Sequence, residues 1–236
     1  MHDIGGAPQT GKAQLTTYQL VGIYLFKKEL PMAPRGQARE NLLQAAIKLI
    51  RQHGYNGTTV DDLCAEAGVT KGAFFHHFKS KDDLAKVAAD YWSAATGELF
   101  ANAAYHKQED ALDRVLGYVD FRGELIEGDV SEFTCFVGTM VQEAYQDVPE
   151  IRRACQESIL GHADTLTDDI REAMAKNGIS GDWTPESLAR HTQAVLQGAY
   201  ILAKATGGTE IALESVRHLH RYIELLFEPA ARRRAA

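Results

Sequence analysis

From residue 34 onward, hydrophobic residues recur at intervals of three and four, the spacing of one face of an α-helix. No segment shows the alternation that is typical of a half-buried strand. The first pattern covers residues 42–50 and stops at Gly54, which predicts a helix of about eighteen residues. The sequence therefore predicts an all-α fold.

Two short helices are expected next, because capping residues and a glycine follow one another at short intervals. Thr58 or Thr59 can accept a backbone N–H at the start of a second helix, which ends at Gly68. Thr70 can cap a third helix that reaches Phe78. Two short helices joined by a glycine-containing turn are typical of a helix-turn-helix.

Six further helices follow from the same spacing, which makes about nine in all. Ser80, Ser131, Thr184 and Thr209 are the expected caps of four of them, and Pro149 lies in the first turn of another. The predicted helices cover residues 80–105, 109–127, 133–145, 149–176, 185–205 and 209–228. The predicted organisation is a three-helix domain at residues 34–80, a larger bundle at 81–228 and a tail at 229–236.

The first 33 residues form a separate segment in this interpretation. Their apolar cluster, residues 20–26, is short and is followed by two lysines, which does not fit a signal peptide. We expect an unpacked extension, with Met32 as the natural start. The alternative is an added helix that packs on the body through Leu20, Ile23, Tyr24 and Phe26.

The composition argues against a membrane-spanning, disulfide-rich or metal-binding protein. Hydrophobic residues make up 45% of the 236 residues, enough for a core, and no apolar run approaches the roughly eighteen residues of a membrane span. The three cysteines are odd in number and widely spaced, so they suggest neither a disulfide framework nor a metal site. We expect a cytoplasmic protein with no metal, no cofactor and no membrane association.

The net charge of −7 is unevenly distributed. Residues 34–92 carry eight basic and seven acidic side chains, whereas residues 93–236 carry 14 basic and 23 acidic ones. The predicted helix-turn-helix can therefore approach a phosphate backbone that the rest of the chain would repel.

The second helix of a helix-turn-helix enters the major groove, so residues 70–75 are expected on its exposed N-terminal part. Gly72 and Ala73 would let the backbone come close to DNA, and Lys71 could donate to guanine or phosphate. The alternative interpretation is that some of these residues are ordinary surface residues and that others, Phe74 above all, belong to the core. The candidate DNA contacts are Thr58, Thr59, Thr70, Lys71, Gly72, Ala73, Phe74, Phe75, His76 and Lys81.

Residues 39–91, and particularly HGYNGTTVDDLCAEAGVTKGAFFHHFKSKDDL at 53–84, resemble the DNA-binding domain of the TetR/AcrR family of regulators. The resemblance implies a homodimeric, all-helical repressor whose C-terminal domain binds an effector. One residue departs from the family pattern. Many members have a tyrosine that reaches a phosphate where this chain has Phe75, whose ring cannot donate that bond.

An effector site is implied mainly by this resemblance. Residues 133–145 mix apolar and polar groups and could line a cavity with neighbouring helices. An ordinary bundle core is the alternative, and an apolar or aromatic molecule is the expected ligand. The candidate ligand-binding residues are Trp92, Phe121, Arg122, Phe133, Phe136, Met140, Glu143 and His162.

Helices 185–205 and 209–228 carry apolar residues on more than one face, which predicts a two-fold four-helix interface with a second copy. The leading hypothesis is a repressor that binds a palindromic operator as a homodimer and is released by a small molecule. The alternative is an effector-independent DNA-binding protein that acts architecturally or through a protein partner. No catalytic motif appears, so an enzyme is not expected.

Overall fold

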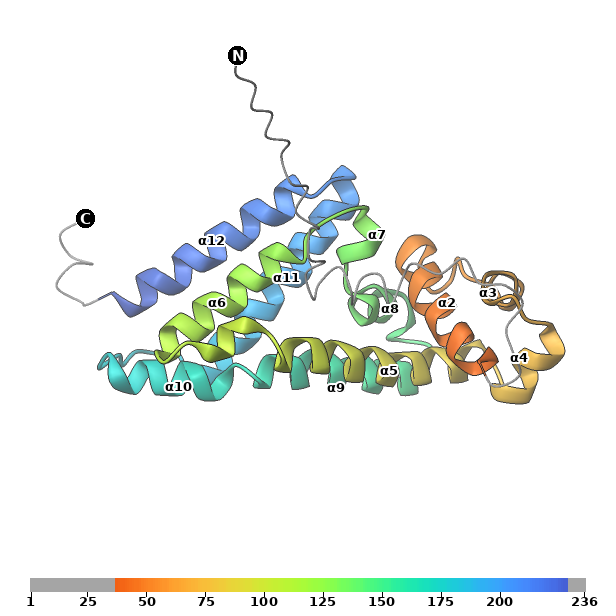
Figure 1. The fold of residues 1–236 in the computed structure, drawn as a ribbon, viewed down its shortest axis with the longest axis horizontal. Coiled ribbons are helices and arrows are strands. Elements are labelled where there is room, and N and C mark those ends of the chain that lie inside the picture. Colours follow the sequence, from red (N-terminus) through yellow and green to blue (C-terminus); the bar gives the residue numbers. More distant parts are fainter. Residues whose placement is uncertain (1–36, 229–236) are drawn as a thin grey trace, which may run out of the picture.

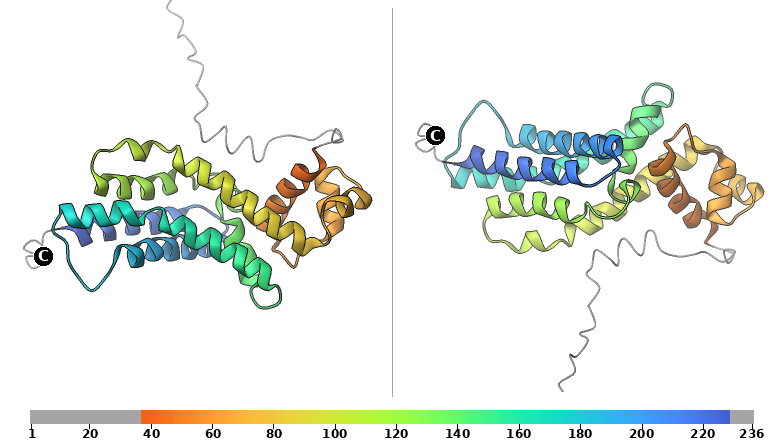
Figure 2. Two further views of the ribbon diagram at one scale, coloured as in Figure 1. Left: turned by 90° about the horizontal axis from the view of Figure 1, so that it is seen from below. Right: turned by 90° about the horizontal axis from the view of Figure 1, so that it is seen from above.

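A computed structural model describes residues 37–228, which form helices and connecting turns with no strand among them (Figure 1). The all-α prediction is confirmed. The expected N-terminal extension at 1–33 and the tail at 229–236 lie outside the described residues. The first three described helices lie at one end of the molecule, and the end of α12 lies at the other (Figures 1 and 2).

The predicted helix-turn-helix is present. Helix α2 (Ala38–His53) precedes α3 (Val60–Ala67) and α4 (Lys71–His77). Thr59 is the N-cap of α3 in a capping box, where its hydroxyl accepts the backbone N–H of Asp62 at 3.2 Å. Gly68 ends α3 in the left-handed conformation, with φ of 64°, so the chain turns sharply into α4.

The long helix α5 (Lys81–Ala101) joins this end of the molecule to the rest (Figure 1). The Ser80 hydroxyl caps it by accepting the N–H of Asp83 at 3.1 Å, as expected. The helix ends four residues before the predicted Tyr105, because the chain tightens after Asn102 into a short 3-10 helix, η1 (Ala104–Lys107).

Two of the predicted helices differ in the structure. The helix predicted at 133–145 corresponds to α8 (Phe136–Ala144), which starts three residues later, and a separate short helix α7 (Val130–Phe133), with Asp129 and not Ser131 at its N-cap, precedes it. The helix predicted at 149–176 is divided into α9 (Pro149–Asp164) and α10 (Thr167–Lys176). These two predictions were wrong because the apolar spacing continues across breaks that no glycine or proline marks.

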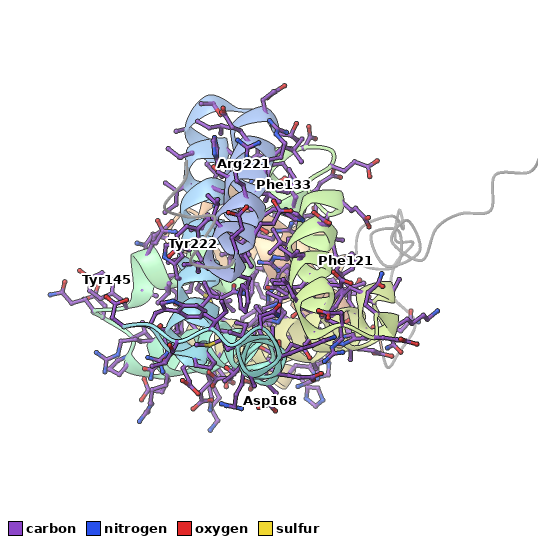
Figure 3. All side chains as sticks on the ribbon, turned by 90° about the vertical axis from the view of Figure 1, so that its left-hand side faces the viewer. Phe121, Phe133, Tyr145, Asp168, Arg221 and Tyr222 are labelled. Atoms are coloured by element: carbon purple, nitrogen blue, oxygen red, sulfur yellow. The ribbon has the colours of Figure 1, made fainter. Side chains whose placement is uncertain are left out.

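The C-terminal helices α11 (Pro185–Thr206) and α12 (Glu210–Phe227) form an antiparallel hairpin, and α6 (Ala111–Glu124) packs against α12. Figure 3 looks along the molecule from the end far from α4, and it shows Arg221 of α12 at the top and Asp168 of α10 at the bottom. Helix α12 therefore covers the face opposite α10.

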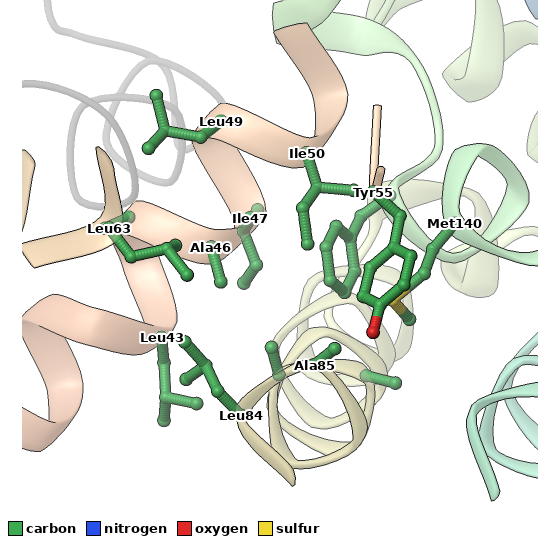
Figure 4. Packing of buried hydrophobic residues seen from close by; sticks show 14 of the residues in the cluster. Leu43, Ala46, Ile47, Leu49, Ile50, Tyr55, Leu63, Leu84, Ala85 and Met140 are labelled. Carbon is green, nitrogen blue, oxygen red and sulfur yellow. The ribbon is translucent and has the colours of Figure 1, made fainter. Parts of the chain in front are cut away.

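The hydrophobic core crosses the predicted domain boundary at residues 80 and 81. Leu43, Ile50 and Leu63 of the helix-turn-helix end are buried together with Leu84 of α5 and Met140 of α8 (Figure 4). A second buried cluster fills the space among α6, α10, α11 and α12. The helices α2, α3 and α4 are therefore attached to the body by a continuous apolar contact.

The left-handed turn at Gly68 can be tested against a helical glycine. No atom lies within 4 Å of a Cβ built on Gly68 or on Gly97 of α5, so only backbone conformation distinguishes them. We expect Gly68→Ala to lower the free energy of unfolding by about 1–2 kcal/mol, because an alanine resists the left-handed region. Gly97→Ala should raise it by about 0.5–1 kcal/mol. Urea unfolding measures both, and equal effects would contradict this account.

Candidate DNA-binding surface and ligand site

Helix α4 presents most of the predicted DNA contacts to solvent. The Thr70 hydroxyl caps the helix by accepting the N–H of Ala73 at 3.1 Å. Lys71, Gly72 and His76 are exposed, and 57% of the Phe75 surface is accessible. An exposed phenyl ring beside a glycine forms a surface that can pack against sugar or a thymine methyl group.

Two of the predicted contacts point into the protein instead. Phe74 is fully buried and packs against Phe78, with ring centroids 6.0 Å apart. Thr58 is 1% exposed, and its hydroxyl donates to the carbonyl of Gly54 at 2.8 Å. These two side chains therefore stabilise the domain, and their prediction as DNA contacts is corrected.

The two predicted lysines lie in different environments. Lys71 is exposed and pairs with Asp61 at 2.7 Å, and this bond raises the pKa of its ammonium group. Lys81 donates to the carbonyls of Tyr55 at 2.9 Å and Thr58 at 3.1 Å. Its ammonium also lies 4.1 Å from the centre of the Tyr55 ring. Lys81 therefore fastens the turn after α2 to the start of α5.

This fastening includes residues that the sequence did not single out. The Tyr55 hydroxyl bonds to the Asp82 carboxylate, and burial, with that bond, raises the pKa of the phenol, which stays protonated. Glu143 of α8, a predicted ligand residue, accepts the backbone N–H of Asn56 at 2.7 Å. The structure thus places Glu143 at the contact between the DNA-binding end and the body.

Three of the predicted ligand residues, Phe121, Arg122 and His162, lie together in one buried group. We call the Arg122 cluster the set of residues Phe100, Tyr118, Phe121, Arg122, His162, Gln193 and Tyr200. The Arg122 guanidinium lies 5.1 Å from the centre of the Phe100 ring and 5.8 Å from the centres of the Tyr118 and Tyr200 rings. Phe121, labelled in Figure 3, packs on Phe100 at 5.1 Å.

A short chain of hydrogen bonds orders the polar groups of this cluster. The Gln193 amide donates to the Tyr118 hydroxyl at 2.7 Å, which leaves that hydroxyl free to donate to His162 Nε2 at 3.0 Å. Burial lowers the pKa of His162 to about 3, and the Arg122 cation adds to this effect. The imidazole is therefore neutral at physiological pH, and Arg122 carries the only charge of the cluster.

The other predicted ligand residues lie apart from this cluster or at its edge. Trp92 and Phe136 pack together at 6.0 Å, and the Arg51 guanidinium lies 5.3 Å from the Trp92 ring. Met140 is fully buried in the same core. Phe133 packs on Tyr200 at 6.2 Å, at the edge of the Arg122 cluster. The predicted set therefore divides between two parts of the interior.

A surface hollow of about 440 Å³ lies elsewhere, between α6 and α12, and contains none of the predicted ligand residues. It is lined by Leu112, Leu116, Arg221, Glu224, Leu225, Phe227 and Glu228. Within residues 37–228, no cluster of side chains has the composition of a metal site. Among the same residues, every helix is too short or too polar to cross a membrane.

Curated transcriptional regulators are similar to this chain in sequence. The transcriptional regulator AcuR of Cereibacter sphaeroides is 27% identical over 177 residues, which cover 72% of this chain and 80% of AcuR. The HTH-type transcriptional repressor AcnR of Corynebacterium efficiens is 27% identical over 186 residues, or 77% of this chain and 89% of AcnR.

Solved structures share the fold. A TetR-family regulator from Agrobacterium tumefaciens superposes with a TM-score of 0.70 at 20% identity and covers 79% of this chain and 97% of its own. A TetR regulator from Chloroflexus aurantiacus superposes with a TM-score of 0.70 at 25% identity, over 80% of this chain and 94% of its own.

Family models match both parts of the chain. The model described as "Bacterial regulatory proteins, tetR family" matches residues 42–88, which contain α3, α4 and the turn between them. The model described as "Tetracyclin repressor-like, C-terminal domain" matches residues 111–219, which contain most of the Arg122 cluster. With both models matched in order on a shared fold, the chain belongs to the TetR family of bacterial transcriptional regulators.

Proposed function

We propose that this protein is a ligand-responsive repressor that binds a palindromic DNA operator in the cytoplasm as a homodimer. The observation that carries the proposal is α4, a capped helix at one end of the molecule whose Lys71, Gly72 and Phe75 face solvent. Such a helix fits a major groove. The relative AcnR is named as a repressor.

The proposed dimer forms through α11 and α12. Of the seven large hydrophobic side chains that are exposed within the described residues, four lie on this hairpin. They are Ile201, Leu202, Tyr222 and Leu225, each between 44% and 49% exposed. Exposed apolar side chains on two long helices become stable in water when a second copy covers them.

Dimerisation would set the spacing of the two α4 helices. Successive major grooves on one side of DNA are about 34 Å apart, so a palindromic site accepts two copies at that separation. Helix α5 joins α4 to the effector-binding body. An effector that favours a body conformation with a different α4 separation would release the operator.

An effector-independent DNA-binding protein, acting architecturally or through a protein partner, is the alternative. The Arg122 cluster favours the ligand-responsive form, because a buried cation among aromatic rings is unusual in a core that serves stability alone.

DNA binding by α4 can be tested with a charge reversal at Lys71. We expect Lys71→Glu to weaken binding at least about tenfold to a fragment selected from random DNA, because it places a negative charge near phosphates. Lys107→Glu, on η1 at the far side of the body, is the matched control and should change affinity little. Gel shifts at fixed salt measure both. Equal effects of the two variants would remove α4 from the interface.

The dimer surface can be tested with a charge in its apolar face. We expect Leu202→Glu to shift the protein to a monomer at micromolar concentration, because a carboxylate would be buried unpaired at the interface. Leu160→Glu places the same charge on an exposed leucine of α9 and should leave the mass unchanged. Sedimentation velocity distinguishes the two forms. A dimeric Leu202→Glu variant, or a monomeric wild type, would contradict the interface.

A further inference from the structure

In the part of the chain that the structure describes, the buried charges are of one sign. Within residues 37–228, the charged side chains that are less than one tenth exposed are Arg51 and Arg122, and no carboxylate is among them. Arg122 is 9% exposed, and no hydrogen bond or ion pair joins its guanidinium to the described part of the chain. A buried cation without an anion lowers the stability of a protein, so its presence calls for a reason.

Neighbouring groups do not supply the missing anion. Hydrogen bonds join Gln193 Nε2 to the Tyr118 hydroxyl and that hydroxyl to His162 Nε2, and the His162 imidazole is neutral. The rings of Phe100, Tyr118 and Tyr200 lie around the guanidinium and offer only their π faces. The Arg122 cluster therefore combines one positive charge, free N–H donors and apolar walls.

Arg114 on the same helix shows the usual arrangement. Its guanidinium is partly exposed and donates to Asp169 at 2.8 Å and to Glu172 at 2.7 Å. Two turns further along α6, Arg122 has the same side chain and no carboxylate. Arg114 therefore shows that an arginine of α6 with a structural role is paired with carboxylates.

We propose that Arg122 binds the carboxylate of a small organic effector whose apolar body packs among the aromatic rings of the cluster. The planar guanidinium matches a carboxylate with two parallel hydrogen bonds. One monovalent anion balances one buried cation, and the rings favour an apolar remainder. This inference rests on the proposed ligand-responsive function and names the chemical class of the ligand.

The position of the cluster connects such a ligand to DNA binding. Phe100 lies in the last turn of α5 and contacts Arg122, Tyr118 and His162, the last at 4.5 Å between ring centroids. An effector bound to Arg122 would contact or displace the Phe100 ring. The other end of α5 is bound to the DNA-binding helices through Lys81, so a shift of α5 would reach α4.

The test compares carboxylates with their neutral amides. Benzoate, phenylacetate and hexanoate are each titrated into the full-length protein beside benzamide, phenylacetamide and hexanamide, at constant ionic strength. We expect at least one acid to raise the melting temperature and release the selected DNA fragment, and its amide to do neither. The proposal is overturned if no acid of this set protects the protein more than its amide.

Three variants decide whether Arg122 is the binding group. Arg122→Met should keep or raise the melting temperature of the ligand-free protein and weaken binding of the protecting acid at least about tenfold, because it removes an unpaired buried charge. Arg122→Lys keeps the charge but loses the pair of parallel hydrogen bonds, so it should weaken binding less than Arg122→Met does. Arg114→Met is the matched control, which should lower the melting temperature and leave the affinity for the acid unchanged.

Two outcomes would overturn the assignment. One is an Arg122→Met protein that binds the acid as the wild type does. The other is loss of stability in both Arg122 variants with no acid bound by the wild type, which would make Arg122 a structural residue. DNA binding by the ligand-free wild type is measured separately, so failure of the regulator function is distinguishable from failure of the carboxylate site.

Discussion

The fold depends on the burial of the first half of α5 against α2. Leu84, Ala85, Ala88 and Ala89 are at most 1% exposed, and three of the four are alanines, whose small side chains let the two helices approach closely. The apolar contact continues into α8 through Met140. Because the helix-turn-helix packs on this surface, its orientation is fixed by the body and does not depend on a flexible linker.

A second set of contacts, polar rather than apolar, holds the same junction. Lys81 bonds to two carbonyls of the turn after α2, Tyr55 bonds to Asp82, and Glu143 accepts the N–H of Asn56. These bonds are directional, so a small rotation of α5 or α8 would break them where apolar packing could adjust. The junction therefore holds the helix-turn-helix in one orientation on the body, and the proposed effector would have to break these bonds to move α4.

The sequence predicted the elements that local signals mark, and it failed where tertiary contacts decide. Residue type alone predicted the caps at Ser80 and Thr184, a cap at Thr58 or Thr59, which the structure places at Thr59, and the left-handed Gly68. The break at Thr134 was missed because it is an extended residue inside an unbroken apolar pattern. Within the short α4, adjacent Phe74 and Phe75 point in opposite directions, and only the packed neighbours show which one is buried. Lys81 was predicted as a phosphate contact because the sequence does not show that its ammonium group donates to the carbonyls of Tyr55 and Thr58.

The excess of negative charge in residues 93–236 bears on how an anion could reach Arg122. Surface charges are screened over about 8–10 Å at physiological salt, so the acidic exterior repels a small carboxylate only weakly once it is near the protein. At contact distance in a partly desolvated interior, one cation attracts one anion by about 4 kcal/mol at an effective dielectric constant of about 20. The attraction between Arg122 and a bound carboxylate therefore exceeds the repulsion by the acidic surface. Recognition would then depend on fit around the guanidinium and not on steering, which suits a sensor that must reject the abundant small anions lacking an apolar body.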